Sequence, residues 1–591
     1  MNPRFDTVVK NGMIIDGSRA PRYRADIGIN DGRIAEIGEL DAGEGKREID
    51  ASGLIVAPGF IDLHTHYDAQ VFWDPHCSIS GWHGVTSVVI GNCGFGFAPV
   101  RPEERERAML TMTRLESIPY ASMKAGLPWD WVTFPQFLDS LERTPKGVNL
   151  MPCVPLGPLI TWVIGSPEEA KHRTPTATEE REIVRLFNEA MDAGGCGWSA
   201  QRLHPDGPAC IQRDYDGTPM VTDVMGDQTC RNLASELGRR NSGFMQLTMA
   251  TADSFHDLKE IEALAELSRR PLLYQALMAF DREPQIHRFL IAWFDYCHAK
   301  GLRVFPQAHT DTTGFTFTLA DWNLFDDSES WREATMGSTQ ERVMKLSDPS
   351  RRAKLKDYAN GQRLLTGDLE NFVIEKIYTT RFKHLEGMTL KDAGRKMDGH
   401  IVDTMLEIAI ADELRTVFDA PPPHTRMDLL REIVNYPYTI PGISDGGAHT
   451  KFYCGGRYPT EFLASFTRDQ DMLTLEEAHW KLSAWPAICA GLLDRGVLRE
   501  GYAADIVVYD YDKLGIEPSA VMHDLPGGEW RRVQRARGYR YIMVNGEVTF
   551  VDGRPTKLTP GLLLRQGNGR KGAANASHDL NQPSPNLSGI S

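Results

Sequence analysis

Two histidines at the end of an apolar strand are the residues of this chain best placed for chemistry. The segment reads Pro58-Gly-Phe-Ile-Asp-Leu-His-Thr-His66, and alternate residues of a strand point to the same side. The imidazoles of His64 and His66 should therefore converge on one point, as a metal site requires. Far downstream, Asp445 ends another apolar segment, Ile-Ser-Asp-Gly-Gly. Without Asp445 the pair could be two unrelated polar residues at a strand end, so this carboxylate is what favours a metal site.

Cys93 adds a sulfur donor, because it follows the apolar run Val88-Val-Ile-Gly-Asn in a glycine-rich turn. Imidazole, thiolate and carboxylate together suit Zn²⁺ better than Mg²⁺ or Ca²⁺. Zinc would lower the pKa of a bound water to about 7 and polarise a scissile carbonyl. Asp445 would then act as general base and afterwards as general acid. A buried, inert thiol is the alternative for Cys93.

The elements that must position these residues are short apolar strands alternating with amphipathic helices, the pattern of a parallel α/β barrel. We predict a (β/α)₈ TIM-like barrel, in which the site lies at the carboxyl ends of the strands. The predicted strands are 60–64, 87–91, 150–156, 196–200, 244–249, 272–277, 303–308 and 439–444. Helices are expected at 179–193, 260–267 and 286–297.

Both ends of the chain have a different texture, with short alternating strands and turn pairs such as Asn11-Gly12 and Asp31-Gly32. We predict that residues 1–57 and 490–564 form one composite β-sandwich domain around a barrel at 58–489. An insertion at about 310–438, with helices at 338–356, 390–396 and 401–418, either covers the barrel mouth or only adds stability. The Gly-, Asn- and Ser-rich residues 565–591 are expected to be disordered.

Composition excludes several classes of function. The chain has 591 residues, of which 41% are hydrophobic, and a net charge of −15, which argues against a nucleic-acid partner. Nine cysteines without a Cys-x-x-Cys pair indicate neither a disulfide framework nor a zinc ribbon. No apolar run is long enough to span a bilayer, and the first residues do not read as a signal peptide. We expect a cytoplasmic enzyme with no membrane partner.

The early His-x-His and the late Ser-Asp-Gly resemble the motifs of the amidohydrolase superfamily. Gly84-Val-Thr-Ser-Val-Val-Ile-Gly-Asn-Cys-Gly94 is similar to the strand-two motif of its N-acyl-D-amino-acid deacylase branch. In that branch this cysteine is a zinc ligand, where other members use a carboxylated lysine after strand four. Strand four here, Gly197-Trp-Ser-Ala-Gln-Arg202, has no lysine. The resemblance covers about residues 5–564 and implies a metal-dependent hydrolase of an amide C–N bond in a small-molecule substrate.

The departures from the branch concern its later histidines. Where strand five should carry one, this chain has Gln246, and where strand six should carry another it has Gln275 or Ala276. Met278 stands where the branch has a lysine that holds the substrate carboxylate. The centre is therefore expected to hold one Zn²⁺, with two left open. Two other hypotheses remain: another amide, cyclic amide or lactone as substrate, and a non-catalytic ligand-binding barrel.

Further polar residues follow the predicted strands and are candidates for contacts with substrate. Lys451 stands where the branch has an arginine that contacts the substrate carboxylate, and a cation there would favour an acidic substrate. Solvated loop residues or surface charges are the alternative for several of them. The sequence also leaves a homo-oligomer open. The candidates are Gln246, Gln275, Arg202, His204, His309, His449 and Lys451.

Overall fold

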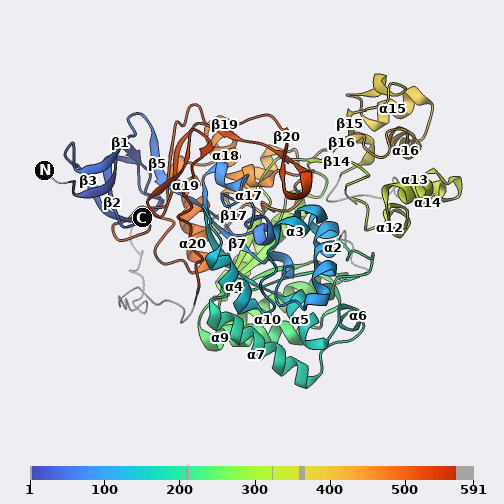
Figure 1. Cartoon of the computed structure of the whole chain (residues 1–591), viewed down its shortest axis with the longest axis horizontal. Helices are drawn as coiled ribbons and strands as arrows, with labels where there is room; N and C mark the ends of the chain where they lie inside the picture. Colours follow the sequence, from blue (N-terminus) through green and yellow to red (C-terminus); the bar gives the residue numbers. More distant parts are fainter. Residues whose placement is uncertain (1–2, 206–211, 322–323, 358–366, 423, 567–591) are drawn as a thin grey trace.

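The computed structural model describes residues 3–205, 212–321, 324–357, 367–422 and 424–566 (Figure 1). Its centre consists of parallel strands in a three-stranded and a six-stranded sheet, each ordered as in the sequence. The first sheet holds β6 (Phe60–Asp62), β7 (Val85–Ile90) and β8 (Asn149–Pro152). The second holds β9 (Val154–Pro155), β10 (Gly197–Arg202), β11 (Phe244–Met249), β12 (Leu272–Leu277), β13 (Val304–Ala308) and β17 (Ile440–Pro441). A strand therefore lies at each of the eight predicted positions.

The two sheets do not join into one continuous closed ladder in the described part of the chain. Only Cys153 separates β8 from β9, so these two strands occupy the single predicted run 150–156. On the opposite side, one isolated parallel bridge between Thr65 and Gly446 links the β6 segment to the β17 segment. The structure thus has an α/β fold with two parallel sheets. Strands β6 and β17 lie at the edges of these sheets and do not pair with each other as a ladder.

Helices pack outside the sheets, as α7, α9 (Asp227–Arg240) and α10 do in the lower part of Figure 1. Helix α7 (Ala177–Ala193) begins at a capping box, in which the Thr176 hydroxyl accepts a hydrogen bond from Glu179 N and the Glu179 carboxylate accepts one from Thr176 N. It buries Ile183 and Phe187, which are four residues apart on one helix face. The predicted helices 260–267 and 286–297 lie within α10 (Ser254–Ser268) and α11 (Pro284–Ala299).

The two ends of the chain interleave in a nine-stranded sheet. Strand β18 (Ile506–Tyr509) pairs antiparallel with β5 (Ile55–Pro58) on one side and with β23 (Tyr539–Val544) on the other. The predicted turn at Asn11-Gly12 was wrong, because β1 (Phe5–Ile14) runs through it as one strand. The pairing register with β2 (Tyr23–Asn30) shifts there, so the pair forms a bulge with Asn11 at φ +62°.

The insertion forms a lobe that projects from the upper right of the body in Figure 1. Its core also takes in Phe452 and Tyr453, and Thr316 N donates to Phe452 O at 2.9 Å. Two predicted helices differ from the structure. Pro349 divides 338–356 into α13 (Thr339–Ser347) and α14 (Pro349–Asp357), and 401–418 ends early as α16 (Ile401–Ala411) before β16 (Val417–Ala420).

The last part of the predicted disordered tail, residues 567–591, lies outside the described residues. Within the described ranges, no helix combines the length and apolar character that a membrane crossing demands.

Candidate metal centre

The backbone that leaves β6 holds His64 and His66 side by side. Between them, Thr65 is tied to Val89 O on β7 by its N–H at 3.2 Å and by its hydroxyl at 2.7 Å. His66 N donates to Gly446 O at 2.7 Å. Since Thr65 is anchored on the sheet side, both imidazoles point away from it, and their ring centroids lie 5.4 Å apart.

Asp445 lies in a tight turn that depends on the two glycines after it. Asp445 itself has a left-handed φ of +48°, and Ser444 Oγ closes the turn by accepting a hydrogen bond from Gly446 N at 3.0 Å. Gly447 has a φ of +91°, and a Cβ atom there would lie 2.7 Å from His66 O. Only glycine suits that position, so the Ser-Asp-Gly-Gly sequence directs the carboxylate toward the histidines.

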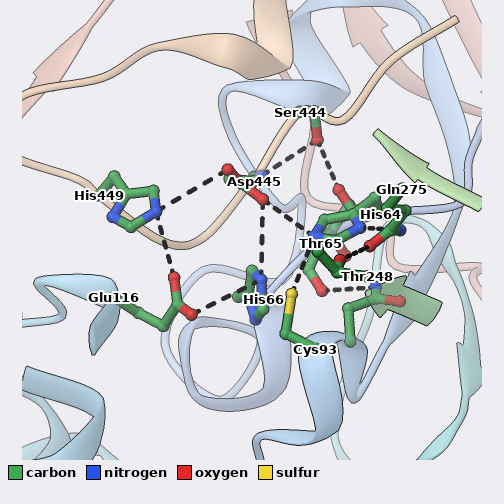
Figure 2. A network of polar contacts seen from close by, with 12 residues as sticks. His64, Thr65, His66, Cys93, Glu116, Thr248, Gln275, Ser444, Asp445 and His449 are labelled. Atoms are coloured by element: carbon green, nitrogen blue, oxygen red, sulfur yellow. Dashed lines mark hydrogen bonds and ion pairs between the residues drawn. The ribbon is translucent and has the colours of Figure 1, made fainter. Parts of the chain in front are cut away.

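Four donor side chains meet in one buried cluster (Figure 2). One ring nitrogen each of His64 and His66 and Sγ of Cys93 lie within 4.8 Å of one another. His64 Nε2 is 3.5 Å from Cys93 Sγ and 3.0 Å from Asp445 Oδ1, which is 3.7 Å from His66 Nε2. Donors bound to one ion at about 2.0–2.3 Å lie roughly 3–4 Å apart, so this cluster can hold a cation.

Cys93 reaches the cluster from the short turn η2 (Asn92–Gly94), where its own φ is +57°. Asn92 Nδ2 supports the turn by donating to Thr65 O and Val89 O, both at 2.9 Å. Burial raises the pKa of the Cys93 thiol well above its ordinary value, and nearby carboxylates raise it further. A cation at this position would favour the thiolate, which is the form that binds metal.

Burial and neighbouring charges set the ionisation of the other ligands. Burial lowers the pKa of His66 to about 3, and His64 adds to the shift, so His66 is neutral at pH 7 and has a nitrogen lone pair for a metal. Burial alone would raise the pKa of Asp445, but the hydrogen bond with His64 and the nearby imidazoles lower it below its ordinary value. Asp445 is therefore a carboxylate that can accept a proton.

A chain of buried glutamine amides lies behind His64. Gln307 Nε2 donates to Gly442 O at 2.9 Å, and Gln246 Nε2 donates to Leu63 O at 2.7 Å. Backbone carbonyls can only accept, so both NH₂ groups are fixed toward them. Gln307 Oε1 is then left to accept from Gln246 Nε2 at 3.0 Å. The two backbone carbonyls, Leu63 O and Gly442 O, therefore fix the orientation of the Gln246 and Gln307 amides.

This orientation determines which nitrogen of His64 carries the proton. Gln275 Nε2 donates to the same Gln307 Oε1 at 2.9 Å and also reaches His64 Nδ1. His64 Nδ1 must then accept, so the proton of the neutral ring is on Nε2, facing Asp445. Neither Gln246 nor Gln275 is left to contact substrate through its NH₂ group. Cation binding through His64 Nε2 has to displace that proton.

Two of the predicted substrate contacts, Arg202 and Lys451, form ion pairs with acidic side chains of the protein. Arg202 Nη1 lies 2.8 Å from Asp227 Oδ1, and Lys451 Nζ lies 2.9 Å from Asp321 and 3.0 Å from Glu529. Both arrangements reduce the attraction that either cation can offer to a substrate carboxylate.

The three predicted histidines are in different surroundings. His309 Nε2 lies 3.0 Å from the hydroxyl of Tyr453, which also bonds Asp311. His204 is exposed on its loop, with a φ of +59°. His449 belongs to the cluster itself, since its Nε2 is 3.8 Å from Asp445 Oδ2.

The sequence reading missed Glu116, the last residue of α2 (Arg105–Glu116). Glu116 is 1% exposed, with Oε1 3.9 Å from His66 Nε2 and Oε2 3.2 Å from His449 Nε2 (Figure 2). It stands in a charged helical stretch, Arg-Leu-Glu-Ser, without any ligand spacing. Gln307 was missed too, because a polar residue inside an apolar strand shows no role until its partners are known.

Comparisons with known proteins place the chain among related sequences. A sequence model of the amidohydrolase family matches residues 47–141 and 373–550. The N-acyl-D-glutamate deacylase of Alcaligenes xylosoxydans xylosoxydans is 25% identical over 97% of this chain and 99% of its own length. An uncharacterized protein of Mycobacterium tuberculosis (strain ATCC 25618 / H37Rv) is 32% identical over 93% of this chain and 90% of its own.

Solved structures support the same fold. A crystal structure of D-aminoacylase matches with a TM-score of 0.65 and 21% identity, over 95% of this chain and all of that chain. The N-acyl-D-glutamate deacylase from Bordetella bronchiseptica, complexed with zinc and a phosphonate inhibitor, matches with a TM-score of 0.64 and 22% identity over 95% and 100% of the two chains.

Proposed function

The chain belongs to the amidohydrolase family, and from that premise we propose that it hydrolyses a non-peptide amide C–N bond at the buried centre of His64, His66, Cys93 and Asp445. The observation that carries the proposal is the spacing of these four donors, which are 3.0 to 3.7 Å apart along the contacts through His64 and Asp445. A non-catalytic binding barrel would have no need of an ionised carboxylate among metal donors.

The donor set fits Zn²⁺, because imidazole, thiolate and carboxylate are its usual ligands. When bound, such an ion supplies Lewis-acid chemistry, polarising the amide carbonyl and making a water more acidic. His66 offers a neutral imidazole, and Cys93 and Asp445 offer negative charge.

Asp445 is proposed to move the proton between the attacking water and the leaving nitrogen. Its carboxylate is ionised, and Oδ1 lies 3.0 Å from His64 Nε2. Ser444 and the two glycines fix the turn, so the carboxylate needs no reorientation between accepting the proton and releasing it.

A small, mainly apolar cavity of about 100 Å³ begins beside Cys93, at Gly94–Gly96. Its wall includes Met112, Trp162 and Met220, which suit an acyl or aromatic group. An N-acyl-D-amino acid is the substrate class suggested by the relatives named deacylases. The pairing of Arg202 and Lys451 with acidic residues favours a second candidate, an amide whose amine part carries no carboxylate.

We further propose that the two parallel sheets belong to one (β/α)₈ barrel at residues 58–489, closed through the Thr65–Gly446 bridge. Residues 1–57 and 490–564 would then form the composite β-domain, since β18 pairs with both β5 and β23.

Metal analysis with a substrate panel tests the function. Purified protein, before and after chelation, is analysed for zinc and assayed on N-acyl-D-amino acids and on matched amides without a carboxylate. We expect bound zinc, loss of hydrolysis on chelation and recovery on adding Zn²⁺. Undiminished amidase activity of metal-free protein would overturn the proposal, and turnover of only the uncharged amides would select the second substrate class.

A further inference from the structure

His309 presents an unpartnered ring nitrogen just beyond the carboxyl end of β13. Gln307 points into the centre of the fold, where its amide contacts Gln246 and Gln275. Alternate residues of an extended segment point to the same side, so His309 points the same way, one step closer to the strand ends. Its N–H donates to Leu277 O at 3.2 Å, which fixes this backbone beside β12. The Nδ1 atom of His309 is buried and, within the described ranges, has no hydrogen-bond partner.

The contacts of His309 decide which of its ring nitrogens carries the proton. The Tyr453 hydroxyl donates its only hydrogen to Asp311 Oδ2. The same hydroxyl can then only accept from His309 Nε2, which is 3.0 Å away, so the proton of the neutral ring is on Nε2. His309 Nδ1 is therefore a hydrogen-bond acceptor. A buried acceptor without a partner is costly, so a ligand that covers this nitrogen should bring a donor.

The surroundings of His309 do not suit a negatively charged ligand. Two carboxyl groups lie behind the ring, since Asp311 is 2% exposed and Glu461 is 5% exposed. Within the described ranges, Arg457 is the one arginine or lysine within 4 Å of either group, and it lies 3.3 Å from Glu461. The ring of His424 packs edge to face on His309 at 5.7 Å, and burial lowers the pKa of His424 to about 4. A substrate carboxylate would meet acceptors and a neutral imidazole here.

A single tyrosine connects His309 to the metal centre. Tyr453 N donates to His449 O at 3.0 Å, and the rings of these two residues lie 6.5 Å apart. His449 in turn lies 3.8 Å from Asp445. The small apolar cavity, in contrast, begins at Gly94, in the turn after β7 of the other parallel sheet. An amide with its acyl group in that cavity would direct its amine part toward His309.

We propose that His309 Nδ1 accepts a hydrogen bond from a donor on the amine part of the substrate, such as a second amide N–H. This inference rests on the proposed function and deepens it, because it names the substrate class as N-acyl amines that carry a neutral donor in place of a carboxylate. Tyr453 and Asp311 are positioning residues, since they fix the proton of His309. A site that binds an N–H rejects the analogue with oxygen at that place, because two acceptors then face each other.

A pair of isosteric substrates tests this subsite. The N-methylamide and the methyl ester of N-acetyl-D-leucine differ only by an N–H in place of an oxygen, and N-acetyl-D-leucine itself supplies the carboxylate. Acetate release by the zinc-loaded full-length protein reports cleavage of the acetamide bond alone and gives kcat/KM for each compound. The wild type should prefer the N-methylamide to the ester by about 5- to 150-fold, the range that an unmet buried acceptor costs at about 1.4 kcal/mol per tenfold. The carboxylate should be the poorest substrate of the three.

Three variants separate recognition from a structural role. His309→Phe keeps an aromatic ring and removes the acceptor, so the ratio of N-methylamide to ester turnover should fall to about one while ester turnover stays within a few-fold. Tyr453→Phe frees the proton of His309 and should also lower the ratio, which keeps the test informative if the first variant does not fold. His298→Phe is the matched control. His298 Nε2 donates to Val304 O at 2.7 Å, and its Nδ1 is likewise buried without a partner in the described structure, but it lies at the opposite end of β13. This control should keep the wild-type ratio.

Two results would overturn the subsite and leave amide hydrolysis intact. One is a wild type that cleaves the ester or the carboxylate as fast as the N-methylamide, and the other is a folded His309→Phe protein with an unchanged ratio. Failure of the zinc-loaded wild type to release acetate from any of the three compounds would overturn the proposed hydrolysis of N-acyl-D-amino-acid derivatives and the subsite with it.

Discussion

Gln307→Met should increase the affinity of the centre for zinc. Gln307 Oε1 fixes the amide of Gln275, whose NH₂ group then faces His64 Nδ1. For His64 to bind a cation through Nε2, its proton must be on Nδ1 and Gln275 must present its oxygen instead. That oxygen would then lie near Gln307 Oε1, where the two amide groups are now 2.9 Å apart. Methionine has similar length and no oxygen, so it removes this obstacle.

The magnitude follows from the contacts that metal binding has to break. Turning the amide loses the Gln275–Gln307 hydrogen bond, about 1 kcal/mol, and leaves an oxygen facing an oxygen, about 1–3 kcal/mol. The sum of about 2–4 kcal/mol corresponds to roughly 30- to 700-fold in zinc affinity, at about 1.4 kcal/mol per tenfold. The free energy of unfolding of the metal-free variant should fall by about 1–3 kcal/mol, because Gly442 O and Gln246 lose their partner.

Chelator competition measures the zinc dissociation constant. Thermal unfolding of the metal-free protein measures the predicted loss of stability. Thr248→Val is the control, because it removes the other hydrogen bond of the Gln275 amide, at 3.0 Å, without changing its orientation. Its zinc affinity should stay within a few-fold of wild type. A folded Gln307→Met protein that binds zinc no more tightly than wild type would show that the amide chain does not control the proton of His64.

Three further predictions concern the ligands and the core. Asp445→Asn should lower kcat by about 10²- to 10⁴-fold in steady-state assays while the circular dichroism spectrum stays unchanged, since an amide cannot accept the proton; wild-type turnover would exclude Asp445 as general base. Cys93→Ser should weaken zinc binding and abolish the thiolate-to-cobalt charge-transfer band of the Co²⁺-substituted protein, and persistence of that band would mean that another cysteine is the ligand. Burial lowers the pKa of His479 to about 3. Between pH 6.5 and 3 the unfolded chain therefore binds a proton that the folded chain does not. The free energy of unfolding should fall as the pH falls below 6.5. At pH 5 this amounts to about 2 kcal/mol, and His479→Gln should show a shallower loss in urea unfolding between pH 6.5 and 5; an unchanged slope would count against it.

Local patterns in the sequence were enough to place the strands and the ligands they carry. All eight apolar runs became strands, and Cys93 and Asp445 follow their strands into the cluster beside His64 and His66. Where a predicted element was wrong, a single local feature of the backbone explains the difference. A bulge replaced the turn at Asn11-Gly12, and Pro349 divided one predicted helix.

The sequence by itself determined that two histidines face one side, because side-chain direction in a strand follows from a two-residue period. The glycines after Asp445 likewise predict a tight turn, because glycine adopts backbone conformations that other residues cannot. Only the tertiary structure decided that Glu116, at the end of a helix, lies between His66 and His449. It also decided that three glutamines from neighbouring strands form one chain of amides behind His64. Contacts across 211 residues between Gln275 and His64 depend on how the strands dock, and docking leaves no local pattern to read.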